Sequence, residues 1–313
     1  MKKGLLLWGV AVLLLVALPP LALKLGQPFY LDLVRRIMIL AIAAVSLNLI
    51  LGYGGLVSFG HAAYLGIGAY AVGILGFYGL TNGWLQWAVA MGASALVALA
   101  IGAVSIRTSG IYFIMITLAF TQMLYYLGIS IAEFGGDDGM RLKARSQFPA
   151  LFDLGDPVAF YYVSLVLMLV SVFIVQRIVN SRFGMVLRAS KSNEARSRAI
   201  GFSPYPYRLA AFVIAGAMCG LAGVLDANLE KFVSPDTLNW PRSGEMIFMV
   251  VLGGMGSLMG PVTGAVVYWL VADRLSELTE YWQVIFGPLL ILVVLFAKGG
   301  IEGTLAKIGR RNA

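Results

Sequence analysis

Side chains able to do covalent or metal chemistry are scarce in this chain of 313 residues. It holds one histidine, His61, and one cysteine, Cys219. Its histidine, cysteine and carboxylate residues show no metal-ligand spacing, and no G-x-x-x-x-G-K-[ST] phosphate loop occurs. We therefore expect no catalytic residue, no metal and no cofactor in this chain. Any step driven by ATP would need a separate polypeptide to hydrolyse it.

Charged side chains gather instead in residues 177–208, which hold seven of the 23 lysines and arginines and a single acid, Glu194. Apolar residues are threaded among these charges, a pattern typical of one or two short amphipathic helices pressed against a partner surface. Long apolar runs flank the stretch on both sides, and Lys/Arg-rich loops between such runs stay in the cytoplasm. We predict a cytoplasmic docking loop. The alternative is that its bases only anchor the loop at anionic lipid.

The composition indicates that membrane-embedded segments position this loop. The chain is 60% hydrophobic and 12% charged, whereas soluble domains carry roughly 25% charged residues. An integral membrane protein follows. The net charge of +8 is concentrated in a few loops and shows no aromatic-interleaved groove pattern, which argues against a nucleic-acid binder.

Apolar runs of about 20 residues predict an all-α, polytopic helical bundle that forms a single domain over residues 1–313. The first 23 residues resemble a signal peptide, but no small-x-small cleavage site follows, so we expect a retained span. Arg35 and Arg36 break the charge rule at the start of the second span. The expected spans are residues 5–23, 34–51, 57–80, 84–106, 111–131, 158–175 and 209–229, and a last span covers 282–296.

Residues 245–271 would place the C-terminus outside if they formed one span, although the tail carries Lys298, Lys307, Arg310 and Arg311. Breaking the run at the glycines of residues 253–261 gives ten membrane segments with both termini cytoplasmic. Broken backbone at membrane depth is tolerated where it is buried in protein or lines a cavity. A second glycine-interrupted stretch lies at residues 51–70, and such pairs point toward a transport path.

Candidate pathway residues lie at these two breaks. Each also has a structural interpretation: hydrogen bonding between helices for Asn48 and Ser58, a bond to a loop carbonyl freed by residues 52–55 for His61, and close packing for the glycines. The candidates are Asn48, Ser58, His61, Gly253, Gly254, Gly256 and Gly260.

The longest expected external loop, residues 133–157, holds five acids and three bases. Its Asp137 and Asp138, with Asp226, Glu230 and Glu245 near the outer ends of later spans, could pair with a basic surface of an external binding protein. A solvated rim is the alternative for each.

Six motifs together give the chain a family resemblance: GYGGLVSFGHAAYLGIGAY, RTSGIYFIMITLAF, GGDDG, the run GMVLRASKSNEARSRAIGFSPYPYRLAAFVIAGAMCGLAGVL, KFVSPDTL and VVLGGMGSLMGPVTGA. In this order and spacing the chain resembles, over nearly its whole length, the permease subunits of bacterial ABC importers for branched-chain amino acids, and among them the longer of the two paralogous permeases.

The resemblance implies a multi-pass protein of the bacterial inner membrane. Its partners would be a paralogous permease, two ATPase subunits that hold ATP and Mg²⁺, and an extracytoplasmic binding protein, with membrane lipid around it. The family's glutamate-alanine-alanine-glycine coupling loop is represented by Glu194, Ala195 and Gly201, with Arg196 in place of the second alanine and the glycine one position late. The expected docking residues are Arg188, Glu194, Ala195, Arg198 and Gly201.

The substrate remains open within the resemblance, because relatives transport urea, short amides or other amino acids besides leucine, isoleucine and valine. An ion-coupled secondary transporter is the alternative of a different class. It would need an ionisable residue deep in a span, and charges are nearly absent there.

Overall fold

The computed structural model describes the whole chain except residues 1, 25, 27–28, 149–151, 297–298 and 305–313. It is built of helices, and each of the ten expected segments contains one. The bases of the C-terminal tail, Lys298, Lys307, Arg310 and Arg311, lie outside the described residues. The helices of the bundle are α1 (Lys2–Lys24), α2 (Phe29–Asn48), α3 (His61–Phe77), α4 (Gly83–Ser105), α5 (Ile111–Ser130), α6 (Pro157–Val179), α9 (Pro204–Glu230), α10 (Trp240–Gly253), α11 (Gly260–Leu278) and α12 (Trp282–Phe296).

In the described part of the chain, five helices are long and apolar enough to cross a bilayer: α2 with its continuation to Tyr53, α4, α5, α6 and α9. Shorter apolar helices cover Val12–Ala22, His61–Phe77 and Trp282–Val293. The chain is thus a multi-pass membrane protein that is mainly helical.

Several predicted bounds are wrong by about a turn. Helix α2 begins at Phe29 rather than residue 34, α3 begins at His61 rather than residue 57, and α9 begins at Pro204 rather than residue 209. Helix α11 continues to Leu278, so the acidic stretch expected as a loop at residues 273–280 is mostly helical. Hydropathy marks the apolar part of a helix, whereas the helix itself runs on wherever backbone hydrogen bonds can form.

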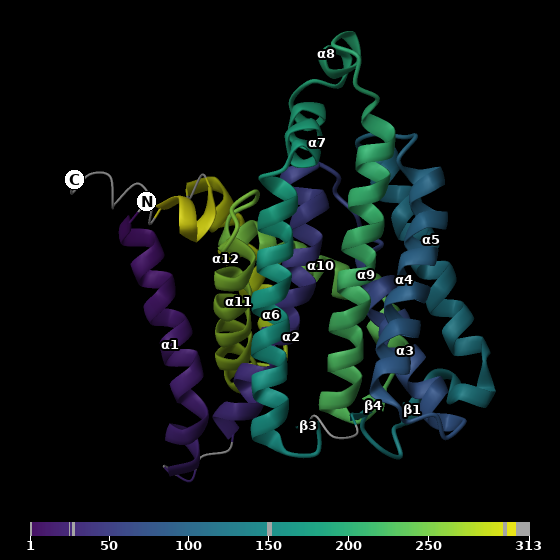
Figure 1. Cartoon of the computed structure of the whole chain (residues 1–313), viewed down its shortest axis with the longest axis vertical. Coiled ribbons are helices and arrows are strands. Elements are labelled where there is room, and N and C mark those ends of the chain that lie inside the picture. Colours follow the sequence, from purple (N-terminus) through teal and green to yellow (C-terminus); the bar gives the residue numbers. More distant parts are fainter. Residues whose placement is uncertain (1, 25, 27–28, 149–151, 297–298, 305–313) are drawn as a thin grey trace.

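Helices α2 and α9 form the centre of the bundle. Helix α9 packs against α4, α3 and α2, while α2 also contacts α6, α10 and α11 (Figure 1). The small residues of α9 permit this packing, because a Cβ at Gly223 would overlap the Leu65 carbonyl and one at Gly220 would meet Ser94. The small residues of α9 thus let its backbone approach those of α3 and α4 closely.

The two arginines that break the charge rule lie inside α2 and have partners there. Arg35 is 4% exposed and pairs with Asp32, while its guanidinium lies 5.5 Å from the centre of the Phe160 ring. Arg36 pairs with Glu230 of α9 and lies 5.1 Å from the centre of the Trp269 ring. Ion pairing and cation–π contacts offset the desolvation that opposes a base at this position.

Residues 131–148, 152–156 and 232–238 fold into a cap at one end of the bundle. The cap contains the 3₁₀ turns η2 (Ala132–Phe134), η3 (Gly136–Asp138) and η4 (Pro235–Leu238). Strand β1 (Met140–Arg141) pairs with β4 (Phe232–Val233), and β2 (Gln147–Phe148) pairs with β3 (Phe152–Asp153). Arg145 ties the cap together, since its Nε donates to the Asn228 carbonyl at 2.9 Å and its Nη1 to the Leu154 carbonyl at 2.7 Å.

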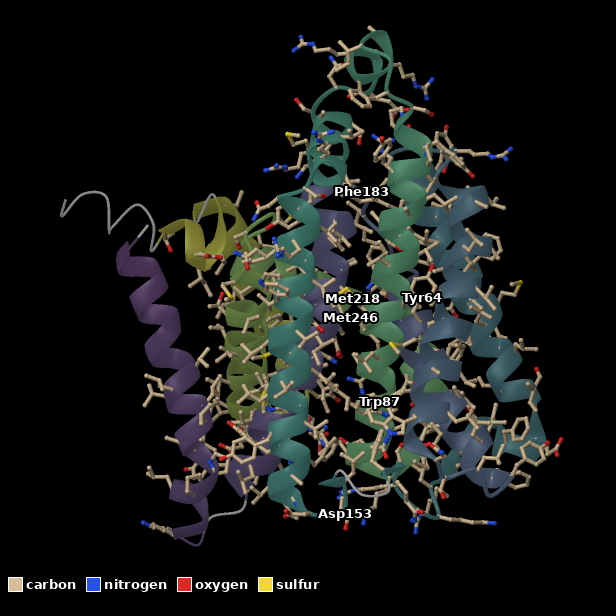
Figure 2. All side chains as sticks on the ribbon, in the orientation of Figure 1. Tyr64, Trp87, Asp153, Phe183, Met218 and Met246 are labelled. Carbon is tan, nitrogen blue, oxygen red and sulfur yellow. The ribbon has the colours of Figure 1, made fainter. Side chains whose placement is uncertain are left out.

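Two short helices, α7 (Arg182–Ser192) and α8 (Glu194–Ala199), project at the opposite end of the bundle (Figure 1). Figure 2 shows the two ends through Phe183 of α7 and Asp153 of β3. The predicted short helices of the basic loop are confirmed, and they lie between α6 and α9 in the sequence.

Candidate functional site

Local capping builds the α7–α8 loop. Ser181 precedes α7, and its hydroxyl accepts from the Gly184 N–H at 3.4 Å. Asn193 separates the two helices and caps α8, since its side-chain oxygen accepts from the Arg196 N–H at 2.9 Å. Helix α8 is followed by Gly201, whose φ of +91° is a conformation that glycine adopts at little cost.

Glu194 is the centre of an ionic clamp at the base of α8. Its carboxylate accepts from Arg208 of α9 at 2.7 Å and from Arg198 of α8 at 2.6 Å. The other Arg208 Nη atom donates to the Ser190 carbonyl of α7 at 2.9 Å. One guanidinium therefore holds α7, α8 and α9 together. We call Ser190, Glu194 and Arg208 the clamp.

The environment of Glu194 favours its ionised form. Partial burial raises the pKa of this carboxyl, but the charge of Arg208 and the hydrogen bonds from Arg198 and Arg208 together lower it more, so that its net pKa lies below the usual value. Only 11% of the Arg208 side chain is exposed, against 67% for Arg198. The Arg208 contact is thus the less solvated of the two.

The expected docking residues therefore differ in their roles within the chain. Glu194 and Arg198 contact each other, while Arg188 and Ala195 are exposed. Arg188 donates a hydrogen bond within α7, to the Gly184 carbonyl at 3.3 Å. Arg208, the partner of Glu194, was not among the predicted docking residues. Nor was Tyr205, whose hydroxyl donates to the Ala103 carbonyl of α4 at 3.0 Å.

An apolar cavity of about 530 Å³ opens between α7, α8 and the start of α9. Met185, Ile200 and Phe202 are 56%, 65% and 44% exposed around it, unusual values for large apolar side chains in a polar loop. Phe183 and Tyr207, whose ring centres are 5.5 Å apart, also line the cavity. The loop thus presents both charges and an apolar hollow to a partner.

The predicted break in the later run is present as a helical hairpin. Helices α10 and α11 pack against each other and are joined by residues 254–259. A Cβ at Gly253 would overlap the Gly260 carbonyl, and Gly254 and Gly256 have φ values of +125° and +75°. The glycines thus serve close packing and the turn together.

The polar candidates at the first break are buried and bonded within the chain. The Asn48 side chain donates to the Ser257 carbonyl at 2.8 Å and accepts from the Gly256 N–H at 3.0 Å. The Ser58 hydroxyl accepts from the Gly60 N–H at 3.1 Å, which supports the local turn. The structure thus brings Asn48 to the α10–α11 turn, while Ser58 stays with its own loop.

His61 bonds to a side chain rather than to the loop carbonyl that we expected. Its Nε2 lies 2.8 Å from the Ser46 Oγ, and the Ser46 hydroxyl in turn donates to the Ala43 carbonyl at 2.7 Å. When that hydroxyl donates to Ala43, its oxygen can accept a hydrogen bond from a protonated His61 Nε2. Ser46 was missed, although it lies two positions before Asn48 in the same apolar run.

The carboxylates proposed for external contact have unequal surroundings. Asp137 and Asp138 are exposed in η3, and Asp226 is half-buried in α9. Glu230 pairs with Arg36, and Glu245 pairs with Arg242 at 3.0 Å beside a cavity of about 220 Å³ lined by Trp269 and Trp282. Among the residues that the structure describes, no group of three histidines, cysteines or carboxylates could hold a metal ion.

Comparison with known proteins gives a consistent result. Residues 29–294 match the family described as "Branched-chain amino acid transport system / permease component". The high-affinity branched-chain amino acid transport system permease protein LivM of Salmonella typhimurium is 28% identical over 293 residues, which cover 86% of this chain and 69% of the relative.

Two relatives from Escherichia coli K12 match as well. The protein named LivM is 28% identical over 318 residues, covering 94% of this chain and 74% of the relative. The permease protein named LivH is 25% identical over 285 residues, covering 84% and 91%. No solved structure matches the chain.

Proposed function

The chain belongs to the family of branched-chain amino acid transport system permease components, and from that membership we propose that it is the permease subunit of an ABC importer that moves leucine, isoleucine and valine across the bacterial inner membrane. Relatives named as LivM and LivH permeases match it over most of its length. The transport step is the movement of substrate along a path through the helical bundle, and ATP with Mg²⁺ is bound by separate ATPase subunits.

The observation that supports this function best is the rigid junction between the α7–α8 loop and the bundle. A loop that passes on a push must not yield where it meets its helices. The clamp meets this need, since Arg208 at the start of α9 holds the Ser190 carbonyl at 2.9 Å and the Glu194 carboxylate at 2.7 Å. Tyr205 fixes the same turn of α9 to α4 at 3.0 Å. A lipid anchor would not need such bracing.

The apolar hollow supports a protein partner for this loop. Residues 177–208 dock on an ATPase subunit through the charged side chains of Arg188, Glu194 and Arg198 together with Ala195 and Gly201, while the cavity beside Met185 accepts an apolar side chain of that subunit. Binding to charged lipid headgroups would gain little from an apolar hollow beside the bases.

The remaining topology follows from the same proposal. The ten helical segments cross or enter the membrane, both termini are cytoplasmic, and residues 133–157 face outward. A paralogous permease completes the pathway, and a soluble binding protein delivers the substrate to the cap, where Asp137 and Asp138 are exposed. The broken hairpin α10–α11, with Gly253, Gly254, Gly256 and Gly260, borders the pathway.

Uptake by reconstituted vesicles tests the function. Vesicles that hold this chain with its co-encoded partners are expected to take up labelled leucine only with ATP on the side of the ATPase subunits, and isoleucine and valine should compete. ATP-dependent uptake of urea or a short amide instead would replace the substrate. Uptake that ignores ATP and collapses with an ion gradient would refute the proposal in favour of a secondary transporter.

Accessibility labelling tests the topology separately. Asp153 belongs to β3 and Ser192 to α7, and these elements lie at opposite ends of the bundle (Figure 1). Cys219 is buried and should stay unlabelled. A membrane-impermeant thiol reagent is expected to label Asp153→Cys from outside and Ser192→Cys only after the membrane is opened. Labelling of both from the same side would contradict the proposed orientation.

A further inference from the structure

A lysine of the coupling loop reaches into the bundle. Lys191, in the last turn of α7, donates from its Nζ to the backbone carbonyl of Gly52 at 2.6 Å. The stem of Lys191 lies over Gly55, since a Cβ on that glycine would be 2.8 Å from the lysine Cγ. Gly55 also has a φ of +72°. Lys191 and Gly52 are 139 positions apart in the sequence, so their contact depends on the tertiary fold.

The carbonyl that Lys191 binds belongs to a π-helical turn. Helix α2 ends in η1 (Leu49–Tyr53), where the spacing of backbone hydrogen bonds widens. The carbonyls of Ile50 and Leu51 accept from the N–H groups of Leu56 at 2.9 Å and Gly55 at 3.2 Å. The Gly52 carbonyl accepts instead from the Lys191 ammonium. Single π-helical turns are weak points of a helix that recur at functional sites.

The same turn contacts the broken hairpin on its other side. A Cβ on Gly52 would overlap both the Asn48 side chain and the backbone N of Gly256. Asn48, one residue before η1, binds the hairpin turn through both ends of its side-chain amide. The amide nitrogen donates to the Ser257 carbonyl at 2.8 Å, and the amide oxygen accepts from the Gly256 N–H at 3.0 Å. Asn48 is 1% exposed, while its partners Gly256 and Ser257 are partly buried.

We propose that this chain of contacts transmits movement: Lys191 couples α7 to the π-helical turn, and Asn48 couples that turn to residues 254–259 of the α10–α11 hairpin. The inference rests on the proposed function, in which α7 moves with the ATPase. When α7 shifts, the Lys191 ammonium pulls the Gly52 carbonyl with it and η1 changes its winding. The hairpin turn, which is hydrogen-bonded to Asn48, then moves as well. Lys191 and Asn48 are positioning residues in this account, and neither contacts substrate.

The geometry favours this role over a general electrostatic one. A base that only held the loop near lipid or near the ATPase would direct its charge away from the bundle, whereas the Lys191 ammonium turns inward onto a backbone dipole. A charge-assisted hydrogen bond of this length is stronger than a neutral one. Its acceptor is the carbonyl of Gly52, which packs against the Asn48 side chain and the Gly256 backbone. A movement of this carbonyl would therefore also move the hydrogen bonds that Asn48 makes to the hairpin turn.

Hydrogen exchange of the full-length chain in its lipid-embedded complex tests the contact itself. We expect Lys191→Met to speed amide exchange within residues 252–260 by about tenfold, as for a lost charge-assisted hydrogen bond that restrains a local opening. Lys191→Arg keeps a donor and should keep most of the protection. The matched control is Arg182→Met, which removes a base from the first turn of the same helix and should change exchange there less than twofold.

The coupling ratio tests the consequence. Lys191→Met is expected to leave the rate of ATP hydrolysis unchanged, while the leucine taken up per ATP hydrolysed falls several-fold. Asn48→Ala should have the same effect on both quantities. Unchanged exchange at residues 252–260 in Lys191→Met would overturn the inference, because the contact would then hold nothing. Equal losses of hydrolysis and uptake would also overturn it, because Lys191 would then act in docking. If the wild-type complex shows no ATP-driven uptake, the proposed function fails, while the exchange experiment still decides whether the contacts are linked.

Discussion

Replacing Glu194 by glutamine should loosen the α7–α8 loop selectively. The substitution removes one negative charge and almost no volume, so it tests the clamp without creating a cavity. Arg208, 11% exposed, would lose its contact of 2.7 Å to a carboxylate but keep the Ser190 carbonyl at 2.9 Å. Arg198 is 67% exposed and would return to water at little cost.

The magnitude follows from these exposures. A hydrogen bond to a charged group contributes about 1.5–3 kcal/mol. Because 36% of the Glu194 side chain is exposed, solvent screening brings the expected loss to the lower end, about 1.5 kcal/mol. Every 1.4 kcal/mol is about a tenfold change in an equilibrium constant. The open population of α8 should therefore rise about tenfold in Glu194→Gln.

Limited trypsin digestion measures this population. Cleavage after Arg196 requires α8 to open, and its rate tracks the open fraction when opening is fast relative to cleavage. The control is Arg198→Gln, which removes the exposed contact between Arg198 and Glu194 and keeps Arg196 as the cleavage site; it should raise the cleavage rate less than twofold. Equal rates in the two variants would refute the reasoning, because the buried contact between Arg208 and Glu194 would then add nothing to the clamp.

The pH dependence of the clamp has a defined sign. The net pKa of Glu194 in the folded loop lies below its reference of 4.5. A lowered carboxyl pKa stabilises the fold fully above the unfolded value, and this contribution is lost as the pH falls through the folded value. The difference in α8 amide exchange between wild type and Glu194→Gln, corrected for the intrinsic rate, should stay constant above pH 4.5 and close at lower pH.

Two further sets of substitutions test the packing of the bundle. Gly223→Val should destabilise the protein by at least about 1–3 kcal/mol, because its Cβ would overlap the Leu65 carbonyl and force α9 away from α3. Gly76→Ala, with open space around its Cβ, should not destabilise the protein. The yield of monodisperse protein and its melting temperature measure this, and a Gly223→Val protein with normal values of both would contradict the packing. Arg36→Glu and Glu230→Arg should each lower the free energy of unfolding by about 1 kcal/mol or less, since both side chains are over a third exposed, and the melting temperature measures the loss. The double variant should recover part of it. A double variant no more stable than the sum of the singles would show that the pair is unimportant.

Much of the architecture could be predicted from the sequence. Apolar run length predicts helices, because each buried backbone group in lipid must be satisfied within its own segment. The parity of charged loops then predicted the break that the structure has between Gly253 and Gly260. The cluster of bases and interleaved apolar residues predicted α7 and α8, and the ordered motifs predicted the family that residues 29–294 match.

The partners of the polar residues could not be predicted in this way. Hydropathy records how strongly a helix prefers lipid but not how it is rotated or at what depth its side chains meet a neighbour. Asn48 bonds to a residue 209 positions away, Lys191 to one 139 positions away, and Arg208 to one 14 positions away. Only the tertiary structure decides which donor meets which carbonyl, because those hydrogen bonds depend on how α2, α7, α9 and the α10–α11 hairpin pack against one another.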